Sequence, residues 1–313
     1  MAKLNIAVQI DPIDTMLVER DTSLVLMVEA QRRGYDVSWF HPDDVFFDRG
    51  RVIARAKRVK VSLEEGEHYK QIDETLRALE EFDVVLIRQD PPFDMGYVSN
   101  TYLLERAKTL VINRPGGVRN IPEKLSTLRY PDLIPPTFVG RDIAALEDFA
   151  DDFDNIVLKP AFMAGGEGVV RLSAKAPGFR AKARNFLDGI GKEPLVAQEF
   201  LPRVMAGDKR VFVLGGEPIG VVRRMPQGGD FRANLHVGGL DEAAELDTRD
   251  REIAAVVAPL LAEEGILFAG LDVIDGRLTE INVTSPTLVR ELKRFGGADL
   301  PALFWDRVET MKR

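Results

Sequence analysis

Residues 266–283 of the chain contain the stretch Ile266-Leu-Phe-Ala-Gly-Leu-Asp272-Val-Ile-Asp-Gly-Arg-Leu-Thr-Glu280-Ile-Asn282-Val283. Two apolar runs, 266–274 and 278–283, flank the turn sequence Asp275-Gly276, which predicts an antiparallel β-hairpin. Glu280 and Asn282 are two residues apart on the second strand, so they point to one face. Polar groups in such an apolar neighbourhood need a partner or a metal.

The register of this hairpin decides whether Asp272 joins them. With a two-residue turn, Asp272 pairs with Thr279 and faces away from Glu280. With a three-residue loop or a bulge, Asp272 stands opposite Glu280. Mg²⁺ prefers hard oxygen ligands, usually one or two carboxylates plus substrate phosphates. We interpret Glu280 and Asn282, with Asp272 in the second register, as a candidate magnesium site; a solvated edge strand is the alternative.

Upstream of the hairpin, strands are predicted at 209–214 and 218–224, and they form a second antiparallel pair. Gly207-Asp-Lys-Arg210 begins the first strand and Arg223-Arg224 ends the second, so basic groups gather at one end of the sheet. Arginine is suited to binding a carboxylate or phosphate with two parallel bonds, although basic strand ends are also routine at surfaces. The glycine-rich segment 226–239 that follows is typical of a lid over an active site, and of plain loops.

A second glycine-rich segment, Phe162-Met-Ala-Gly165-Gly166-Glu-Gly168, follows a predicted strand that ends at Lys159. Its backbone N–H groups could approach phosphate oxygens, and the Lys159 ammonium could lie beside them. The segment matches neither the P-loop nor the dinucleotide fingerprint, and a tight turn is the alternative. Lys124 is placed at a predicted helix start, where a lysine is unfavourable against the helix dipole. This indicates another role for Lys124; a solvated lysine, which is common at helix starts, is the alternative.

The first third of the chain has a different order of predicted strands and helices. Strands are predicted at 4–10, 37–40, 83–88 and 110–113, and helices after Asp21, at 72–82 and at 97–108. This alternation predicts a mostly parallel α/β sheet in residues 1–120. The fold class is therefore α/β, with an N-terminal parallel α/β domain (1–121), a central α+β lid domain (122–201) and a C-terminal antiparallel-sheet domain (202–313).

Composition excludes several classes of protein. The 313 residues suffice for two or three packed substructures. The net charge of −8 opposes non-specific attraction to nucleic acid or to an anionic membrane. No cysteine is present, so disulfides and thiolate metal sites are excluded, and three scattered histidines do not suggest a zinc site. No signal peptide or stretch of roughly 18 apolar residues is found, so we expect a cytoplasmic location.

Taken in this order, the segments resemble the ATP-grasp superfamily and specifically the bacterial glutathione synthetase family. The similar segments run the full length of the chain: Asp11-Pro12, Glu29-Ala-Gln-Arg-Arg-Gly-Tyr35, Arg88-Gln-Asp-Pro-Pro-Phe-Asp94, Gly207-Asp-Lys-Arg210, Met225-Pro-Gln-Gly-Gly229 and Leu278-Thr-Glu-Ile-Asn-Val-Thr-Ser-Pro-Thr287. The resemblance implies an enzyme that ligates γ-glutamylcysteine and glycine to glutathione, with ATP converted to ADP and phosphate. It implies Mg²⁺ as cofactor, with Mn²⁺ also usable, and a homotetramer.

The resemblance also implies roles for individual residues. Lys124, Lys159, Gly165 and Gly166 would contact phosphates, Gln198, Glu199, Phe200, Leu201 and Asp208 the rest of the nucleotide, and Asp272, Glu280 and Asn282 the metal. Arg210 and Arg224 would lie near the reacting carboxyl, with Ser285 and Pro286 in the substrate site. The predicted lid differs from the family pattern at Ala233 and His236. These two residues bear on the rate of lid movement and not on the type of reaction.

Two other functions remain as alternatives at this stage. One is another ATP-grasp ligase, such as a D-alanine–D-alanine ligase or a peptide-tail glutamate ligase, which would share the metal strand. The other is a nucleotide-binding protein that keeps the fold without ligation. ADP release that requires both γ-glutamylcysteine and glycine would separate the three.

Overall fold

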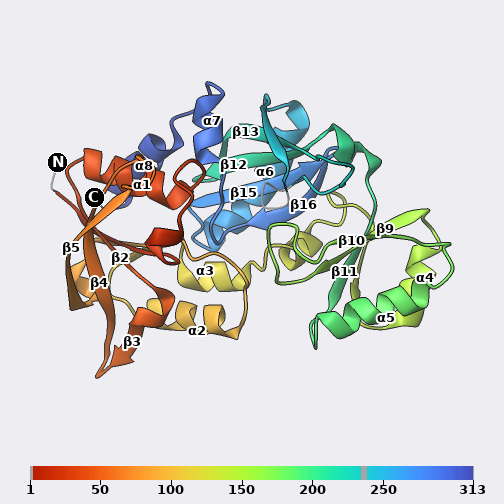
Figure 1. Ribbon diagram of the computed structural model, residues 1–313, viewed down its shortest axis with the longest axis horizontal. Helices are drawn as coiled ribbons and strands as arrows, with labels where there is room; N and C mark the ends of the chain where they lie inside the picture. Colours follow the sequence, from red (N-terminus) through yellow and green to blue (C-terminus); the bar gives the residue numbers. More distant parts are fainter. Residues whose placement is uncertain (1–2, 234–237, 313) are drawn as a thin grey trace.

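Three β-sheets organise the molecule. The computed structural model describes residues 3–233 and 238–312, and contains a seven-stranded, a four-stranded and a five-stranded sheet. The seven-stranded sheet lies at one end of the molecule and the four-stranded sheet at the other, with the five-stranded sheet between them (Figure 1). The predicted fold class is confirmed.

The centre of the N-terminal sheet is parallel, in the order β2-β1-β6-β7. These strands are β1 (Asn5–Gln9), β2 (Asp36–Phe40), β6 (Val84–Ile87) and β7 (Leu110–Ile112). The helices of this part are α1 (Thr22–Arg32), α2 (Met95–Leu104) and α3 (Pro115–Asn120). Asp21 caps α1 because its side chain accepts a hydrogen bond from the N–H of Leu24. The four strands predicted in this region are confirmed.

Three antiparallel strands make this sheet mixed: β3 (Val45–Asp48), β4 (Arg51–Val61) and β5 (Tyr69–Ala78). The helix predicted at 72–82 is therefore wrong. Ile72 and Leu76 have helical spacing, but they are 47% and 54% exposed, so no buried helical face exists. The long pairing with β4 instead satisfies the backbone of this segment. A short 3₁₀ turn, η3 (Leu79–Glu81), follows β5.

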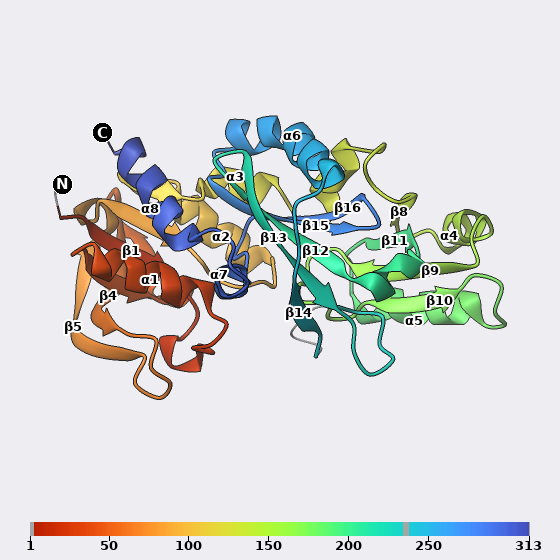
Figure 2. The same ribbon diagram turned by 90° about the horizontal axis from the view of Figure 1, so that it is seen from above.

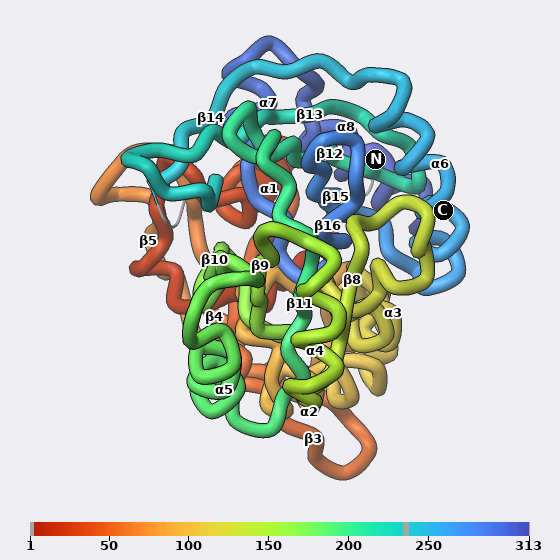
Figure 3. The backbone as a smooth tube through the Cα atoms, turned by 90° about the vertical axis from the view of Figure 1, so that its right-hand side faces the viewer, coloured from red at the N-terminus to blue at the C-terminus, as the bar shows by residue number. Residues whose placement is uncertain are grey.

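The four-stranded sheet is antiparallel, in the order β10-β9-β11-β8. Its strands are β8 (Thr137–Gly140), β9 (Asn155–Pro160), β10 (Val170–Ser173) and β11 (Leu195–Glu199). Helices α4 (Ile143–Ala150) and α5 (Phe179–Gly189) cover one face, and Leu146, Leu158 and Ala183 belong to the buried core between them. Figure 3 views the molecule from this end.

The five-stranded sheet is also antiparallel, in the order β14-β13-β12-β15-β16. Its strands are β12 (Asp208–Leu214), β13 (Glu217–Met225), β14 (Leu240–Ala243), β15 (Phe268–Ile274) and β16 (Arg277–Asn282). Helix α6 (Thr248–Glu263) packs against it, beginning at a capping box of Asp247 and Asp250. Both hairpins predicted from the sequence are confirmed.

The end of the chain returns to the N-terminal part. Helix α7 (Val289–Arg294) leads to α8 (Leu300–Met311), which packs on α1, where Trp305 Nε1 donates to the Leu26 carbonyl at 2.8 Å. The two termini therefore lie near one another (Figures 1 and 2). The remaining elements are η1 (Ile13–Thr15), η2 (Pro42–Asp44), η4 (Leu125–Arg129) and η5 (Pro202–Ala206). Over residues 3–233 and 238–312, the structure has no helix whose length and apolar character would let it cross a membrane.

One buried side chain links the N-terminal sheet to the five-stranded sheet. The Asn113 amide donates to the carbonyls of Phe268 and Val283, and its oxygen accepts from the N–H groups of Leu267 and Phe268. Asn113→Ala leaves these groups unpaired, so we expect a loss of about 3 kcal/mol or more in the free energy of unfolding. Denaturant titration measures it. Exposed Asn120→Ala is the control, and a similar small loss in both variants would contradict this role.

Candidate active site

Two adjoining cavities contain every site residue singled out from the sequence. The inter-sheet cavity lies between the four- and five-stranded sheets, and the large cavity, of about 790 Å³, lies between the N-terminal and five-stranded sheets. Glu280 lines both, so the cavities meet at β16. The inter-sheet cavity is also lined by Lys124, Lys159, Gly166, Gln198, Glu199, Phe200, Leu201, Asp208 and Asp272. The large cavity is also lined by Gly165, Arg210, Arg224, Asn282, Ser285 and Pro286.

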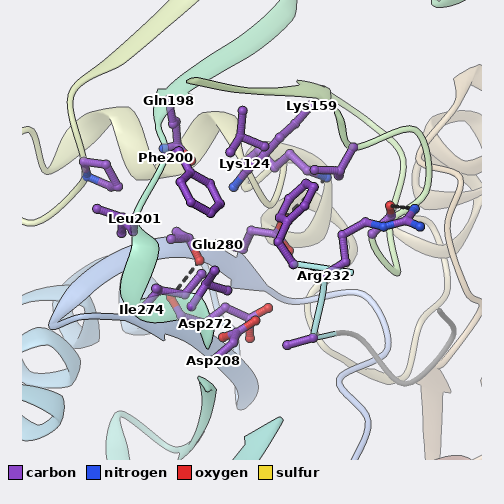
Figure 4. A pocket seen from close by; sticks show the side chains of 18 of the residues that line it. Lys124, Lys159, Gln198, Phe200, Leu201, Asp208, Arg232, Asp272, Ile274 and Glu280 are labelled. Carbon is purple, nitrogen blue, oxygen red and sulfur yellow. Dashed lines mark hydrogen bonds and ion pairs between the residues drawn. The ribbon is translucent and has the colours of Figure 1, made fainter. Parts of the chain in front are cut away.

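One side of the inter-sheet cavity is an apolar slot. Phe200, at the end of β11, packs with Val157 and Val204, and the Phe231 ring meets it edge-on at 5.7 Å between centroids. Gln198 is buried in the same lining, and its amide donates to Thr137 Oγ1 at 3.0 Å. Figure 4 shows Gln198, Phe200 and Leu201 facing the two lysines across the cavity. A flat ring with a polar edge fits such a lining.

The opposite side of the inter-sheet cavity is cationic. Lys124 is 5% exposed in its side chain, donates to the Met163 carbonyl and lies 3.7 Å from Glu280 Oε1. It precedes the short helix η4 as its N-cap, so the helix that was expected here is a 3₁₀ turn. Burial lowers the pKa of Lys159, and no carboxylate of the described residues lies within 4 Å of its ammonium. A bound anion would stabilise this charge.

The glycine-rich segment closes the cationic side. Gly165, Gly166 and Gly168 have φ angles of 65°, 80° and 66°, a region that residues with a side chain rarely adopt. The Met163 carbonyl in the same segment receives Lys124, and the Gly166 carbonyl accepts from Arg232 at 3.3 Å. Glycine is therefore required by the backbone path that brings this segment to the cavity.

The β15–β16 hairpin combines features of both registers considered above. Ile274 pairs with Arg277 across the two-residue turn Asp275-Gly276, and a bulge then lets Asp272 pair with Glu280. Thr279 is the extra residue, and its hydroxyl donates to the Asp272 carbonyl at 3.2 Å. Asp272 therefore stands opposite Glu280, as the bulged register requires.

Asp272 is bound by two arginines. Its Oδ2 lies 3.1 Å from Arg210 Nη2 and 2.9 Å from Arg224 Nη2, and its Oδ1 accepts from Arg210 Nε. Arg224 also forms an ion pair with Asp208 across the β12–β13 pair. Gly270 makes room for this arrangement, because a Cβ there would lie 2.6 Å from Arg210 Cδ. The result is a fully buried network of two carboxylates and two guanidinium groups.

The two carboxylates of this network differ in proton affinity. Burial raises the pKa of Asp208 to about 7, against the attraction of Arg224, and its Oδ1 is buried without a hydrogen bond in the described part of the chain. Burial acts on Asp272 in the same direction, but Arg210 and Arg224 outweigh it and hold the Asp272 pKa well below its ordinary value. Asp272 is therefore the permanent anion of the network, and Asp208 titrates near neutral pH.

This difference predicts a pH effect on stability. Asp208 keeps its proton in the folded chain at pH values where the unfolded chain, with the ordinary value of 3.8, has released it. Between about pH 4 and 7 the contribution of this carboxyl to stability therefore falls as pH rises. Asp208→Asn has no such carboxyl and does not lose this stability. The free energy of unfolding of the variant minus that of wild type should therefore be about 2 kcal/mol larger at pH 8 than at pH 5. Denaturant titrations at both values test this, and parallel wild-type and variant profiles would contradict it.

The donor atoms near β16 fit a divalent cation in the company of phosphate. Glu280 and Asn282 share a face, and the Asn282 amide nitrogen donates to the Gly270 carbonyl, which leaves its oxygen as a ligand atom. Nowhere in residues 3–233 and 238–312 do three or more acidic or histidine side chains gather into a ready-made cation site. A cation here would need oxygens from its ligand, as Mg²⁺ commonly does.

The large cavity contains residues that sequence analysis did not select as site residues. Asp11 lies two residues after β1, and Arg88 directly follows β6 and donates to Ser23 Oγ and the Pro286 carbonyl. Asp90 accepts from the Ser285 hydroxyl. Carboxyl ends of parallel strands commonly form ligand sites, and charged residues within two positions of the ends of β1 and β6 were the available signal. Glu123, bonded to Thr284, was missed entirely.

Comparison with known families assigns the chain to a family. The N-terminal domain model of prokaryotic glutathione synthetase matches residues 4–119, and the ATP-grasp domain model of the same family matches residues 123–297. The chain belongs to the prokaryotic glutathione synthetase family. Glutathione synthetase of Mesorhizobium japonicum is 44% identical over 99% of this chain and all of its own length. Glutathione synthetase of Brucella melitensis is 45% identical over 99% of both chains.

Solved structures support the fold of this glutathione synthetase family member. The D-cycloserine synthetase DcsG has a TM-score of 0.68 with 17% identity, covering 99% of this chain and all of that one. The D-alanyl-alanine synthetase A of Vibrio cholerae has a TM-score of 0.59 with 13% identity, covering 95% of each chain. At such identities the similarity shows the fold alone. The family assignment makes the chain an ATP-dependent ligase of glutathione synthesis that uses a divalent metal.

Proposed function

We propose that the chain joins the cysteinyl carboxylate of γ-glutamylcysteine to the amine of glycine, through an acyl phosphate made with ATP. The observation that carries this proposal is the meeting of the two cavities at Glu280. ATP would occupy the inter-sheet cavity and γ-glutamylcysteine the large cavity. The γ-phosphoryl group and the acceptor carboxylate would then come together beside β16, where the cationic side chains converge.

The nucleotide has a suitable partner for each of its parts. Lys124, Lys159 and the backbone of Gly165 and Gly166 would contact the phosphates, since this side of the cavity is cationic. The adenosine part would lie against the apolar slot of Phe200. Its neighbours on the same side are Gln198, Glu199, Leu201 and Asp208.

Glu280 and Asn282 would hold Mg²⁺, with Mn²⁺ as a possible substitute. The cation would supply neutralisation of phosphate charge. Asp272 stands opposite Glu280, but both of its oxygens already accept hydrogen bonds from arginine. It would reach the cation only by sharing its carboxylate with Arg210 and Arg224.

In the proposed mechanism the cysteinyl carboxylate accepts the γ-phosphoryl group, ADP leaves, and the glycine amine displaces phosphate from the acyl phosphate. Arg210 would orient the carboxylate and stabilise the oxyanion of the tetrahedral intermediate, assisted by Arg224. Ser285 and Pro286 would line the donor site. Water must be kept out because an acyl phosphate hydrolyses readily.

The segment 226–239 is the proposed lid. Its described part already touches the site, because Phe231 packs on Phe200 and Arg232 bonds the Gly166 carbonyl. Ala233 is buried, whereas His236 lies outside the described residues. Closure over a bound nucleotide would complete the wall of the inter-sheet cavity.

Release of ADP tests the proposed function. The rate should require γ-glutamylcysteine and glycine together, and mass spectrometry should find glutathione. Comparable ADP release with D-alanine alone, or with a protein carrying a glutamate tail, would favour one of the other ATP-grasp ligases. ATP binding without release in any mixture would favour a nucleotide-binding protein without ligase activity.

We propose three working units, 1–121, 122–201 and 202–313, with α8 packed back on the first of them. We also propose a homotetramer, which sedimentation at several protein concentrations would test, and a cytoplasmic location, where ATP, γ-glutamylcysteine and glycine would be available.

A further inference from the structure

Glu123 and Lys124 are neighbours in sequence but serve different cavities. Lys124 lines the inter-sheet cavity and Glu123 lines the large cavity. The Glu123 carbonyl accepts from the Ile281 N–H at 2.9 Å, which fixes this link along β16 between Glu280 and Asn282. Glu123 therefore stands where the proposed nucleotide and donor sites meet.

Within the described part of the chain, Thr284 alone donates hydrogen bonds to the Glu123 carboxylate. Its Oε1 accepts from Thr284 Oγ1 at 2.7 Å and from the Thr284 N–H at 3.4 Å. Its Oε2 receives no hydrogen bond from any residue that the structure describes, and this atom is not sealed from the cavity. One oxygen thus anchors the group and the other is presented to a ligand.

The neighbouring carboxylates already have cationic partners. Asp208 pairs with Arg224, Asp272 pairs with Arg210 and Arg224, and Glu280 lies 3.7 Å from Lys124. Glu123 forms no ion pair within 4 Å with any described cation. A carboxylate withdrawn from water without a cation is costly, so a positively charged ligand group would stabilise it.

We propose that Glu123 binds the ammonium group of glycine, the amino acid acceptor, and that, once this group has released one proton to solvent, Glu123 holds the neutral amine toward the activated carbonyl. This inference rests on the proposed function. The reaction brings a small zwitterion to the place where Arg210 and the phosphates would meet, and Arg210 lines the same cavity as Glu123. Because Thr284 fixes the Glu123 carboxylate, the bound glycine nitrogen would approach the carbonyl carbon from a defined direction.

The other ammonium group in the reaction is a poorer partner. In γ-glutamylcysteine the glutamyl ammonium lies at the opposite end of the dipeptide from the cysteinyl carboxyl that is activated. The same cavity supplies further carboxylates, among them Asp11 beyond β1 and Asp21 at the start of α1, which come from the N-terminal part of the chain. Glu123 lies instead beside Thr284 and the metal strand, at the end where the new bond forms.

The test uses Glu123→Gln, which removes the charge but keeps an oxygen that can accept from Thr284. We expect the KM for glycine to rise roughly 10- to 100-fold, as loss of a charge-assisted bond predicts. The KM values for ATP and γ-glutamylcysteine should stay within about threefold. Glu123→Asp keeps the charge with a shorter reach and should give an intermediate KM. Glu242→Gln, an exposed change on β14 outside both cavities, is the matched control.

Hydroxylamine separates this inference from the proposed function. It is uncharged at neutral pH and traps an acyl phosphate as a hydroxamate without needing an ammonium site. Glu123→Gln should therefore form hydroxamate from ATP and γ-glutamylcysteine at the wild-type rate while its reaction with glycine is impaired. Wild-type protein that makes no hydroxamate would refute the acyl phosphate itself, whatever Glu123 does.

Three outcomes would overturn the inference while leaving the proposed function intact. An unchanged KM for glycine in Glu123→Gln would exclude the ammonium contact. A rise in the KM for γ-glutamylcysteine alone would assign Glu123 to the donor ammonium. Equal losses with glycine and hydroxylamine, together with a lower melting temperature, would show that Glu123 only supports the fold around Thr284.

Discussion

Replacing Glu280 with glutamine should lower kcat roughly 100- to 1,000-fold, the effect of removing one preorganised charge from a site of phosphoryl transfer. The folding transition should barely move. Among the residues that the structure describes, Glu280 forms an ion pair within 4 Å only with Lys124, at 3.7 Å, and its side chain is 18% exposed. It also contributes repulsion to Glu123, where burial and the Glu280 charge raise the pKa, so its removal relieves strain between charges.

The measurement for Glu280→Gln is steady-state ADP release over a range of Mg²⁺ concentrations, with a thermal melt on the same sample. Weakened cation binding predicts that more Mg²⁺ restores part of the rate. Glu217→Gln, at the exposed start of β13 in the same sheet, is the control and should behave as wild type. Wild-type turnover of Glu280→Gln at low Mg²⁺ would remove Glu280 from the proposed site.

The chemistry of β15 and β16 could be predicted because it is local in sequence. Apolar runs around Asp275-Gly276 give the hairpin, and the spacing of Glu280 and Asn282 gives the shared face. The register could not be derived from the turn alone. The bulge at Asp272 depends on Thr279 bonding back to the Asp272 carbonyl, and its counterpart in the neighbouring strand is Arg210. Those are contacts across the sheet, which a turn sequence does not specify.

The N-terminal sheet shows where periodicity fails. The stretch from Ile72 to Phe82 has apolar residues at helical spacing, yet its backbone pairs with β4 as a strand up to Ala78 and then forms the 3₁₀ turn η3. Pairing partners are chosen by tertiary context, and it overrides the local pattern. Sequence analysis did not find Glu123 and Arg88 of the large cavity for a related reason. Glu123 and Thr284 are 161 positions apart, and Arg88 meets Pro286 across 198 positions, so no local motif announces either contact.

The structure also refines which arginine variant is informative. Arg210 is buried against Asp272, which has no other cation besides Arg224 within 4 Å among the described residues. Arg210→Ala would leave that carboxylate half-neutralised, at a cost of about 3–5 kcal/mol in stability. Loss of activity in the alanine variant would then mix folding with chemistry. Arg210→Lys keeps the positive charge beside Asp272 and removes only the bidentate hydrogen bonding of the guanidinium group.

Arg210→Lys should therefore fold and yet lose roughly 100- to 1,000-fold in kcat, with the KM for ATP within about threefold of wild type. The reason is geometric: Nε and Nη2 both bond Asp272, which aims the guanidinium into the large cavity, and a lysine ammonium cannot reproduce that direction. Arg223→Lys is the matched control, because residue 223 points to the opposite face of β13 from Arg224.

Hydroxylamine trapping gives Arg210→Lys a signature of its own. If Arg210 orients the carboxylate that receives the phosphoryl group, hydroxamate formation must fall together with glutathione formation, because the acyl phosphate itself is made slowly. Glu123→Gln is expected to separate the two rates, so the pair of variants assigns the arginine to activation and the carboxylate to the acceptor. Undiminished hydroxamate formation in Arg210→Lys would place Arg210 after the phosphoryl transfer, at the tetrahedral intermediate alone.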